Sequence, residues 1–190
     1  MYGKWMSLGI TFVIALAGCS HHDKPHEYGQ QRPPVDQIDP RDRGIQSMDV
    51  VAASDRMAAS LLARPELNAS KVQWTIVIDR VEDLTTDHEF RTNYQIFLER
   101  LRVNLSKQGQ GRVVLIENKD QFYNVRNREL EGAPQGPAPQ AIQPDFSLYL
   151  KAMDMPNRGT NYYYLQFALT DLHNRVQVWL DQYEVRSARE

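Results

Sequence analysis

The sequence contains a single cysteine, Cys19, among its 190 residues. No disulfide can form within one chain, so a folded domain must be stabilised by its hydrophobic core. The sequence also lacks a Gly-x-Ser-x-Gly nucleophile elbow, a His-Glu-x-x-His zinc motif and a glycine-rich phosphate-binding loop. The formal net charge is only -2, without the strong basic excess typical of nucleic-acid-binding proteins. We therefore expect no enzyme, no cofactor, no metal, and neither nucleic acid nor a small-molecule substrate as a ligand.

The longest apolar run lies at the N-terminus, over residues 5–15, and is too short to cross a bilayer as a helix. A basic residue precedes it, and Ala17 and Gly18 stand directly before Cys19. This order is typical of a lipobox, in which small residues precede a cysteine that carries a diacylglyceryl group. We predict a lipoprotein signal peptide at 1–18 and lipidation, including palmitate, at Cys19. An ordinary secretory signal or an uncut membrane anchor is the alternative interpretation.

Ser20 directly follows the cysteine. Resemblance to other bacterial lipoproteins implies that a serine at this position directs the protein to the outer membrane, whereas an aspartate favours retention in the inner membrane. We therefore expect a protein that is anchored in the outer membrane through its N-terminal lipid and faces the periplasm. Two or three acyl chains hold such a protein firmly, because each buried methylene contributes about 0.8 kcal/mol.

Residues 19–44 are polar, contain four prolines and show no apolar period of a helix or a strand. We interpret them as the lipidated cysteine followed by a disordered tether. A coil of that length typically spans about 25 to 30 Å. His21, His22 and His26 could form a metal-binding tract, but histidines without a packed shell are more typical of a soluble linker.

The remaining residues, 45–190, are expected to form one globular α/β domain. Apolar residues recur at helical spacing or in the alternating and β-branched patterns of strands. The predicted helices are 47–63, 89–108 and 119–130. The predicted strands are 72–81, 113–116, 146–151, 162–169 and 176–185. The first two strands are separated by a helix and should be parallel, and the last three should form an antiparallel meander. The fold class is therefore a mixed sheet of about five strands, a parallel pair plus a meander, flanked by about three helices.

The helix at 47–63 should direct Met57 and Leu61 to the core and Asp49 mostly elsewhere, with Ser47 as its N-cap. Two further helical stripes are predicted, a strong one in the second helix and a weaker one in the third. The strong stripe is Tyr94, Phe97, Leu98, Leu101 and Leu105, and the weaker one is Phe122, Val125 and Leu130. The strand at 72–81 is nearly continuous in its apolar character, which predicts burial on both faces.

Local sequence in the domain resembles that of a known family. The strand at 75–82 runs into Asp83-Leu84-Thr85, Val178-Trp179 lies in the last strand, and a lipobox and a proline-bearing tether precede the domain. With the order helix, strand, helix, strand, helix and meander, these features resemble the LpoB family of penicillin-binding-protein activators. The fold of that family is similar to the N-terminal domain of TolB. The family usually has asparagine where this chain has Asp83.

The resemblance implies an adaptor without catalytic residues. Such a protein is an outer-membrane lipoprotein that binds a class A penicillin-binding protein anchored in the inner membrane. Binding stimulates glycan polymerisation and crosslinking, and so regulates peptidoglycan synthesis, cell-wall biogenesis and cell shape. The alternative is a non-catalytic envelope scaffold or a secretion-associated lipoprotein with a different periplasmic partner.

Two groups of side chains are candidates for partner binding. Alternation along the meander should place Tyr149, Lys151, Tyr162 and Tyr164 on one face, where tyrosine combines a large area with a hydrogen-bonding tip. The alternative is that a helix covers this face and the tyrosines belong to the core. The second candidate surface is the segment 121–128 with the loop that follows it, where Arg126 and Arg128 could meet an acidic partner, although a solvated helix face explains these arginines as well.

Overall fold

The structure is a computed structural model, and it describes residues 43–86, 92–131 and 142–188. The predicted signal peptide, Cys19 and nearly all of the tether, with its three histidines, lie outside the described residues. The helices are α1 (Ser47–Leu62), α2 (Pro65–Ala69), α3 (Gln95–Gln108) and α4 (Lys119–Glu129). The strands are β1 (Trp74–Leu84), β2 (Val113–Ile116), β3 (Phe146–Asn157), β4 (Thr160–Asp171) and β5 (Gln177–Ala188). Of the helices in these three ranges, none is both long and apolar enough to span a membrane.

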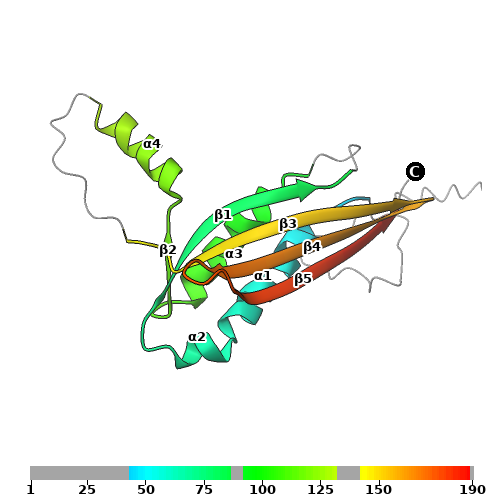
Figure 1. Ribbon diagram of the computed structural model, residues 1–190. Coiled ribbons are helices and arrows are strands. Elements are labelled where there is room, and N and C mark those ends of the chain that lie inside the picture. Colours follow the sequence, from blue (N-terminus) through cyan, green and yellow to red (C-terminus); the bar gives the residue numbers. More distant parts are fainter. Residues whose placement is uncertain (1–42, 87–91, 132–141, 189–190) are drawn as a thin grey trace, which may run out of the picture.

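The strands form one mixed sheet in the order β2-β1-β3-β4-β5 (Figure 1). β1 pairs in parallel with β2, as predicted, and also with β3. β3, β4 and β5 form the predicted antiparallel meander. The predicted α/β class with a five-stranded mixed sheet is therefore confirmed. The parallel part of the sheet is one strand wider than the predicted pair.

The hydrophobic core lies between one face of the sheet and helices α1 and α3, which Figure 1 shows behind the strands. Every residue of the strong stripe predicted for the second helix is buried, and Met57 and Leu61 of α1 are fully buried. These side chains pack in one cluster with Ile76, Leu148 and Phe167 from the sheet. Helical periodicity in the sequence therefore identified the packed faces of both helices.

The start of α1 differs from the prediction. Gln46 is the N-cap, and Asp49 is fully buried instead of lying on the polar side. The Asp49 carboxylate accepts a hydrogen bond from the Gln46 backbone N–H at 2.8 Å. An acidic side chain at this position satisfies a backbone N–H that has no partner within the helix. The prediction of Ser47 as the cap was wrong because this local exchange of hydrogen bonds determines where the helix begins.

β1 is buried on one face only, so the prediction of burial on both faces was wrong. Ile76 and Ile78 are buried, whereas Asp79 and Arg80 are exposed and Val77 is half-buried. The pairing of β1 with β3 shifts register between Ile78 and Val81, which is the signature of a β-bulge. A nearly continuous apolar run therefore does not require helices on both sides of the sheet.

The helices number four in the described residues, against about three predicted. The additional helix is α2, which has Pro65 in its first turn. Proline prevents α1 from continuing, but its fixed φ angle suits the first turn of a new helix. α3 begins at Gln95, and residues 87–91, where the prediction had an earlier start, lie outside the described residues.

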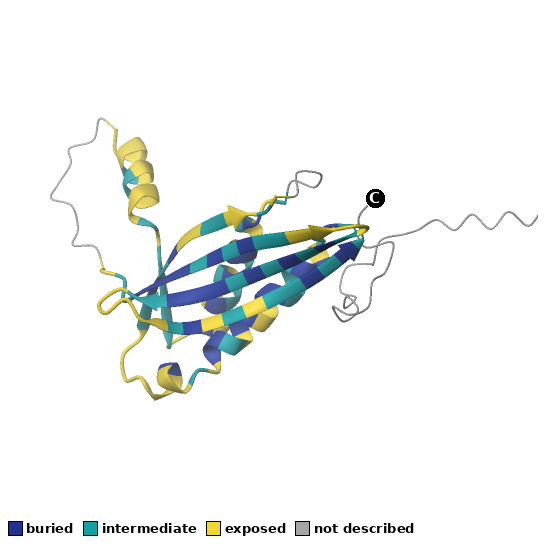
Figure 2. Cartoon of the chain, turned by 45° about the vertical axis from the view of Figure 1, so that its right-hand side comes forward, coloured by how far each residue is buried: buried dark blue, intermediate teal, exposed yellow. Residues whose placement is uncertain are grey.

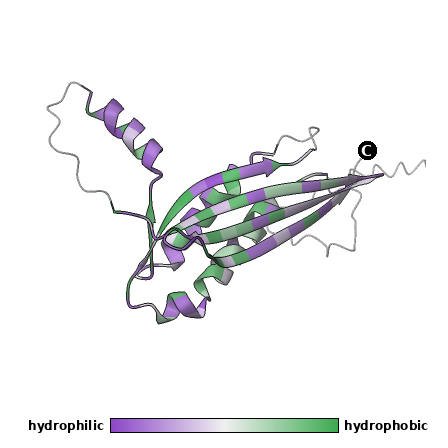
Figure 3. Cartoon of the chain, viewed as in Figure 1, coloured by the Kyte–Doolittle hydropathy of each residue, from purple (hydrophilic) through white to green (hydrophobic). Residues whose placement is uncertain are grey.

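α4 does not pack into the core. None of its residues is buried, and the predicted stripe of Phe122, Val125 and Leu130 is exposed. Figure 2 shows α4 projecting away from the end of the sheet, and Figure 3 shows that its surface is mostly hydrophilic. The prediction of a packed stripe was therefore wrong, because three separated apolar residues in a polar helix do not make a continuous apolar face.

The two ends of the domain carry different elements. Arg43 pairs with Ala188, so the described chain begins beside the end of β5. The β3–β4 turn at Arg158 and Gly159 lies at this same end, since Asn157 and Thr160 pair with each other and Thr160 also pairs with Ala188. Gly159 has a φ of 74°, a conformation that favours glycine. α4 lies at the opposite end of the sheet (Figure 1).

A partly exposed cluster around Asp145 joins the starts of β1 and β3 to the turn between β4 and β5. The Thr75 hydroxyl donates to the Asp145 carboxylate at 2.6 Å, and the backbone N–H of Asp145 donates to the carbonyl of Thr75 at 3.0 Å. The other carboxylate oxygen lies 3.2 Å from His173 Nε2, in the turn between β4 and β5. The Thr75 hydroxyl first, and His173 second, hold the pKa of Asp145 below its usual value.

Replacing Asp145 by asparagine is expected to lower the free energy of unfolding by about 1 kcal/mol at pH 7, because a partly exposed charged acceptor is lost. The lowered folded-state pKa means that the charged form stabilises the fold. This contribution is present above the unfolded pKa of about 3.9 and is lost as the pH falls through the folded pKa. Urea unfolding at pH 7 and at several values below pH 4 should show the difference from wild type shrinking. Glu131→Gln, at an exposed carboxylate, is the control and should have no such effect.

Candidate functional site

The first candidate surface is the face of the sheet opposite α1 and α3, which we call the open face. Strand register places the four residues predicted to share a face there, Tyr149, Lys151, Tyr162 and Tyr164. All four are half-buried. Across the described residues, neither Figure 1 nor Figure 2 shows a helix lying over this face, so it is not an internal layer of the core. Their part in binding stays a prediction.

Side chains of β5 hold the three tyrosines of the open face. Gln177 Nε2 donates to the hydroxyl of Tyr149 at 2.7 Å, and the Tyr164 hydroxyl donates to Gln182 Oε1 at 2.5 Å. Burial first, and a hydrogen bond to Glu184 second, raise the pKa of Tyr162 to about 12. The Tyr162 hydroxyl therefore keeps its proton further into alkaline solution than an ordinary tyrosine does.

The remaining predicted residue of the open face, Lys151, forms an ion pair with Glu82 of β1 at 3.2 Å. Both side chains are partly exposed, so the pair contributes little to stability. The ion pair does link Lys151 of β3 to the neighbouring strand β1. The ammonium group is thereby drawn toward β1, on the side of β3 away from Tyr162 and Tyr164.

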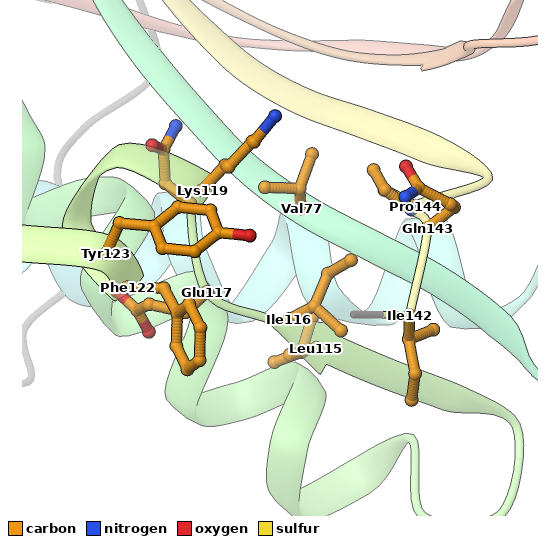
Figure 4. A pocket seen from close by; sticks show the side chains of 11 residues that line it. Val77, Leu115, Ile116, Glu117, Lys119, Phe122, Tyr123, Ile142, Gln143 and Pro144 are labelled. Carbon is orange, nitrogen blue, oxygen red and sulfur yellow. The ribbon is translucent and has the colours of Figure 1, made fainter. Parts of the chain in front are cut away.

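The second candidate surface is a cleft of about 790 Å³ beneath α4. Figure 4 shows Phe122 and Tyr123 of α4 on one side of it, with Val77 and Ile116 of the sheet between them and Ile142. Ile142 is 65% exposed and Phe122 is 39% exposed. Large apolar side chains that remain this exposed around a concavity are typical of a binding site.

Local contacts fix the base of α4 beside the cleft. The side chain of Asn118 accepts a hydrogen bond from the Asp120 N–H at 3.0 Å and so caps the helix. Arg102 of α3 pairs with Glu117, the residue after β2. The chain therefore leaves the sheet at a defined position, although the rest of α4 makes few contacts.

Charges on α4 are divided between its two sides. Lys119 and Arg126 lie on the same side as Phe122 and Tyr123, because helix positions three, four and seven apart share a face. Neither cation has an ion-pair partner among the described residues. Arg128 is two positions, or about 200°, from Arg126. It is 71% exposed and pairs with Glu129.

The structure therefore separates the predicted site residues into distinct places. Arg126 and Arg128 do not share a face, and α4 lies at the opposite end of the sheet from Tyr162 and Tyr164. The prediction grouped the segment 121–128 with the loop that follows it, but it had no cleft between them, because it did not place Val77 and Ile116 of the sheet beside both. One sequence feature could have pointed to this surface, the low hydropathy of the third predicted helix, because such a helix does not pack into a core.

A hydroxyl, a carboxylate and an imidazole meet at Thr75, Asp145 and His173, but their order is not that of a catalytic triad. In a triad the imidazole lies between the hydroxyl and the carboxylate and takes the proton. Here the carboxylate lies in the middle, with Thr75 and His173 both bonded to it. Over residues 43–86, 92–131 and 142–188, no group of three or more potential metal ligands was found.

Comparison with protein families matches residues 49–185 to the family described as peptidoglycan-synthase activator LpoB. Among solved structures, the LpoB C-terminal domain from Escherichia coli is 20% identical, with a TM-score of 0.45, over 72% of this chain and 98% of that chain. The corresponding domain from Salmonella enterica is 19% identical, with a TM-score of 0.45 and the same shares of the two chains. A lipoprotein from Neisseria meningitidis is 13% identical, with a TM-score of 0.36, over 60% of this chain and 83% of that chain. A comparison with curated proteins found no match.

The family match runs from the first turn of α1 to the second half of β5 and so includes the helices and the sheet that build the core. This coverage is independent of the N-terminal segment and its lipobox. The chain belongs to the LpoB family of peptidoglycan-synthase activators, which are regulators of a synthase rather than catalysts.

Proposed function

We propose that this protein is an outer-membrane lipoprotein that binds and activates a class A penicillin-binding protein. The family match over residues 49–185 carries this proposal, because it gives the general role of synthase activator. The lipobox ending at Cys19 supports the lipid anchor, and Ser20 supports the outer membrane as its destination. The proposed organisation is a signal peptide at 1–18, a lipidated tether at 19–44 and a globular domain at 45–190.

The proposed docking surface for the synthase is the cleft together with the side of α4 that faces it. This surface combines the exposed apolar side chains of Phe122 and Ile142 and the half-buried ring of Tyr123 with the cations Lys119 and Arg126. Aromatic and arginine side chains supply most of the binding energy in many protein interfaces. The partner segment should therefore present an apolar side chain flanked by carboxylates.

The test is reconstitution with the class A synthase of the same organism. Protein expressed from residue 19 with Cys19→Ala, which carries neither signal peptide nor lipid, should increase the rate at which the synthase polymerises its lipid-linked precursor. Tyr123→Ala should weaken binding by about 30-fold, the equivalent of about 2 kcal/mol for an aromatic residue at an interface. Titration of the polymerisation rate against activator concentration measures this change.

Two controls separate docking from misfolding. Tyr123→Phe retains the ring and should bind within a few-fold of wild type, and Lys107→Ala changes an exposed residue of α3 that does not line the cleft. No stimulation by the wild-type protein contradicts the activator role itself. Stimulation that Tyr123→Ala leaves unchanged contradicts only the proposed docking surface.

A further inference from the structure

We propose that the open face of the sheet binds a neutral polysaccharide of N-acetylated hexosamines, such as the glycan backbone of peptidoglycan. The site consists of Tyr149, Tyr162 and Tyr164 with the polar residues between them. It goes beyond the activator role and does not depend on it, because it concerns a different surface and a different ligand. Three features carry the inference: the orientation of the rings, the polar centre of the face and its charge balance.

The tyrosine rings are held so that they lean along the sheet instead of standing upright. Tyr164 pairs with Glu184 in the register but bonds to Gln182, and Tyr162 pairs with Arg186 but interacts with Glu184. Both side chains therefore reach across to β5 with the same two-residue offset. Because residues two apart on a strand are separated by about 7 Å, the two rings repeat one another at this spacing.

Tyr149 lies over the neighbouring strand. It starts on β3, opposite Ala168 of β4, and its hydroxyl reaches Gln177 on β5. The side chain must therefore cross β4, and Ala168 is fully buried although it lies on the open face. A ring fixed over an alanine presents its other side to solvent. Sugar rings have apolar C–H faces that pack against such flat aromatic surfaces.

The centre of the open face is polar. Between the row of Tyr149 and the row of Tyr164 lies the cross-strand row of Lys151, Gln166 and Gln182. Lys151 is the one charged residue of this row, and its ammonium pairs with Glu82 at the β1 side of the face. The amides of Gln166 and Gln182 and the carboxylate of Glu184 lie beside the tyrosines and match a ligand whose hydroxyl and acetamido groups alternate with apolar faces.

The ionic groups of the open face cancel. Among the residues that the strand register places on this face, the cations are Lys151 and Arg186 and the anions are Glu82 and Glu184, and the adjoining bulge in β1 adds one charge of each sign, Asp79 and Arg80. Balanced charge favours a neutral ligand over nucleic acid or an anionic membrane. The tyrosine rows extend from Ala168 to Tyr162 on β4, about 20 Å at the usual rise per residue, which suits an elongated chain of several sugars.

The test uses the chain expressed from residue 19 with Cys19→Ala and two glycans, a chitin-derived N-acetylglucosamine tetramer and purified peptidoglycan sacculi. Wild type should bind the tetramer saturably in calorimetry or NMR titration and should sediment with sacculi. Tyr164→Ala or Tyr149→Ala should weaken tetramer binding by at least about tenfold, because a stacking surface is lost. Tyr164→Phe, which retains the ring, should stay within about threefold, and Lys107→Ala should bind like wild type.

Each alternative result overturns the proposal. Absence of saturable binding to both glycans excludes the site. An equal loss of tetramer affinity in Tyr164→Phe and Tyr164→Ala excludes ring stacking. A loss of thermal stability that matches the loss of affinity shows that the tyrosine acts through the fold and not as a stacking surface. If the alanine variants bind glycan normally but fail to stimulate the synthase, the open face is a protein-docking surface. Since glycan binding is measured without the synthase, a negative result leaves the activator role standing.

Discussion

Replacing Leu101 by alanine is expected to lower the free energy of unfolding by about 2 to 5 kcal/mol. Leu101 has 0% exposure in the middle of α3 and packs in the cluster shared by α1, α3 and the sheet. Its truncation removes apolar contacts and leaves a cavity that rigid neighbours fill only in part. A domain of this size is typically stable by about 5 to 15 kcal/mol, so the loss is a large share of the total.

Urea unfolding followed by circular dichroism measures the Leu101 effect as a shift in midpoint at unchanged slope. Val103→Ala is the matched control, because Val103 is on the same helix, two positions away, and is 48% exposed. Its effect should stay within about 0.5 kcal/mol. Equal effects at the two positions would show that α3 does not pack on the sheet as described.

Replacing Cys19 by alanine is expected to abolish lipidation completely. The thiol at Cys19 is the only one in the sequence, and no other side chain can form the thioether. Without the acyl chains the protein loses the burial of their methylenes, each contributing about 0.8 kcal/mol to membrane binding. Metabolic labelling with palmitate should fall to background, and the protein should retain residues 1–18 as a larger precursor on gels.

Ser20→Asp is the matched variant for the Cys19 experiment. It should keep the palmitate label and the shortened mature chain while moving the protein from the outer to the inner membrane on density gradients. Labelling that persists in Cys19→Ala shows that the N-terminal interpretation is wrong. Loss of function in cells for Ser20→Asp, with labelling intact, supports an activator that must start from the outer membrane.

Periodicity in the sequence was sufficient to predict the helices and strands that bury a single apolar face. The stripe from Tyr94 to Leu105 and the alternation in the meander both describe burial against a single layer, and the structure confirms both. These patterns are reliable because a helix or strand with one apolar side has only one way to bury it. The mixed five-stranded sheet followed from them.

Features that depend on a second partner in space could not be derived from periodicity. Asp49 is buried because its carboxylate accepts a hydrogen bond from the backbone N–H of Gln46. Helical periodicity treats every acidic residue as polar and therefore assigns it to the exposed side of the helix. The second parallel pairing of β1 joins segments almost seventy residues apart. The cleft likewise exists only because Tyr123 and Ile142 line the same cavity, which the order of elements alone does not determine.

The positions of Arg43 and α4 at opposite ends of the sheet affect how far the protein can reach. Strands of twelve residues span about 40 Å, whereas the tether expected from the sequence at 19–44 would span about 25 to 30 Å as a relaxed coil. With the proposed anchor at Cys19, the folded domain therefore provides the larger part of the distance to the docking surface. A coil resists extension with an entropic force, but a pleated sheet does not lengthen. The domain thus acts as a rigid spacer, and its orientation on the tether matters more for reach than a few added tether residues.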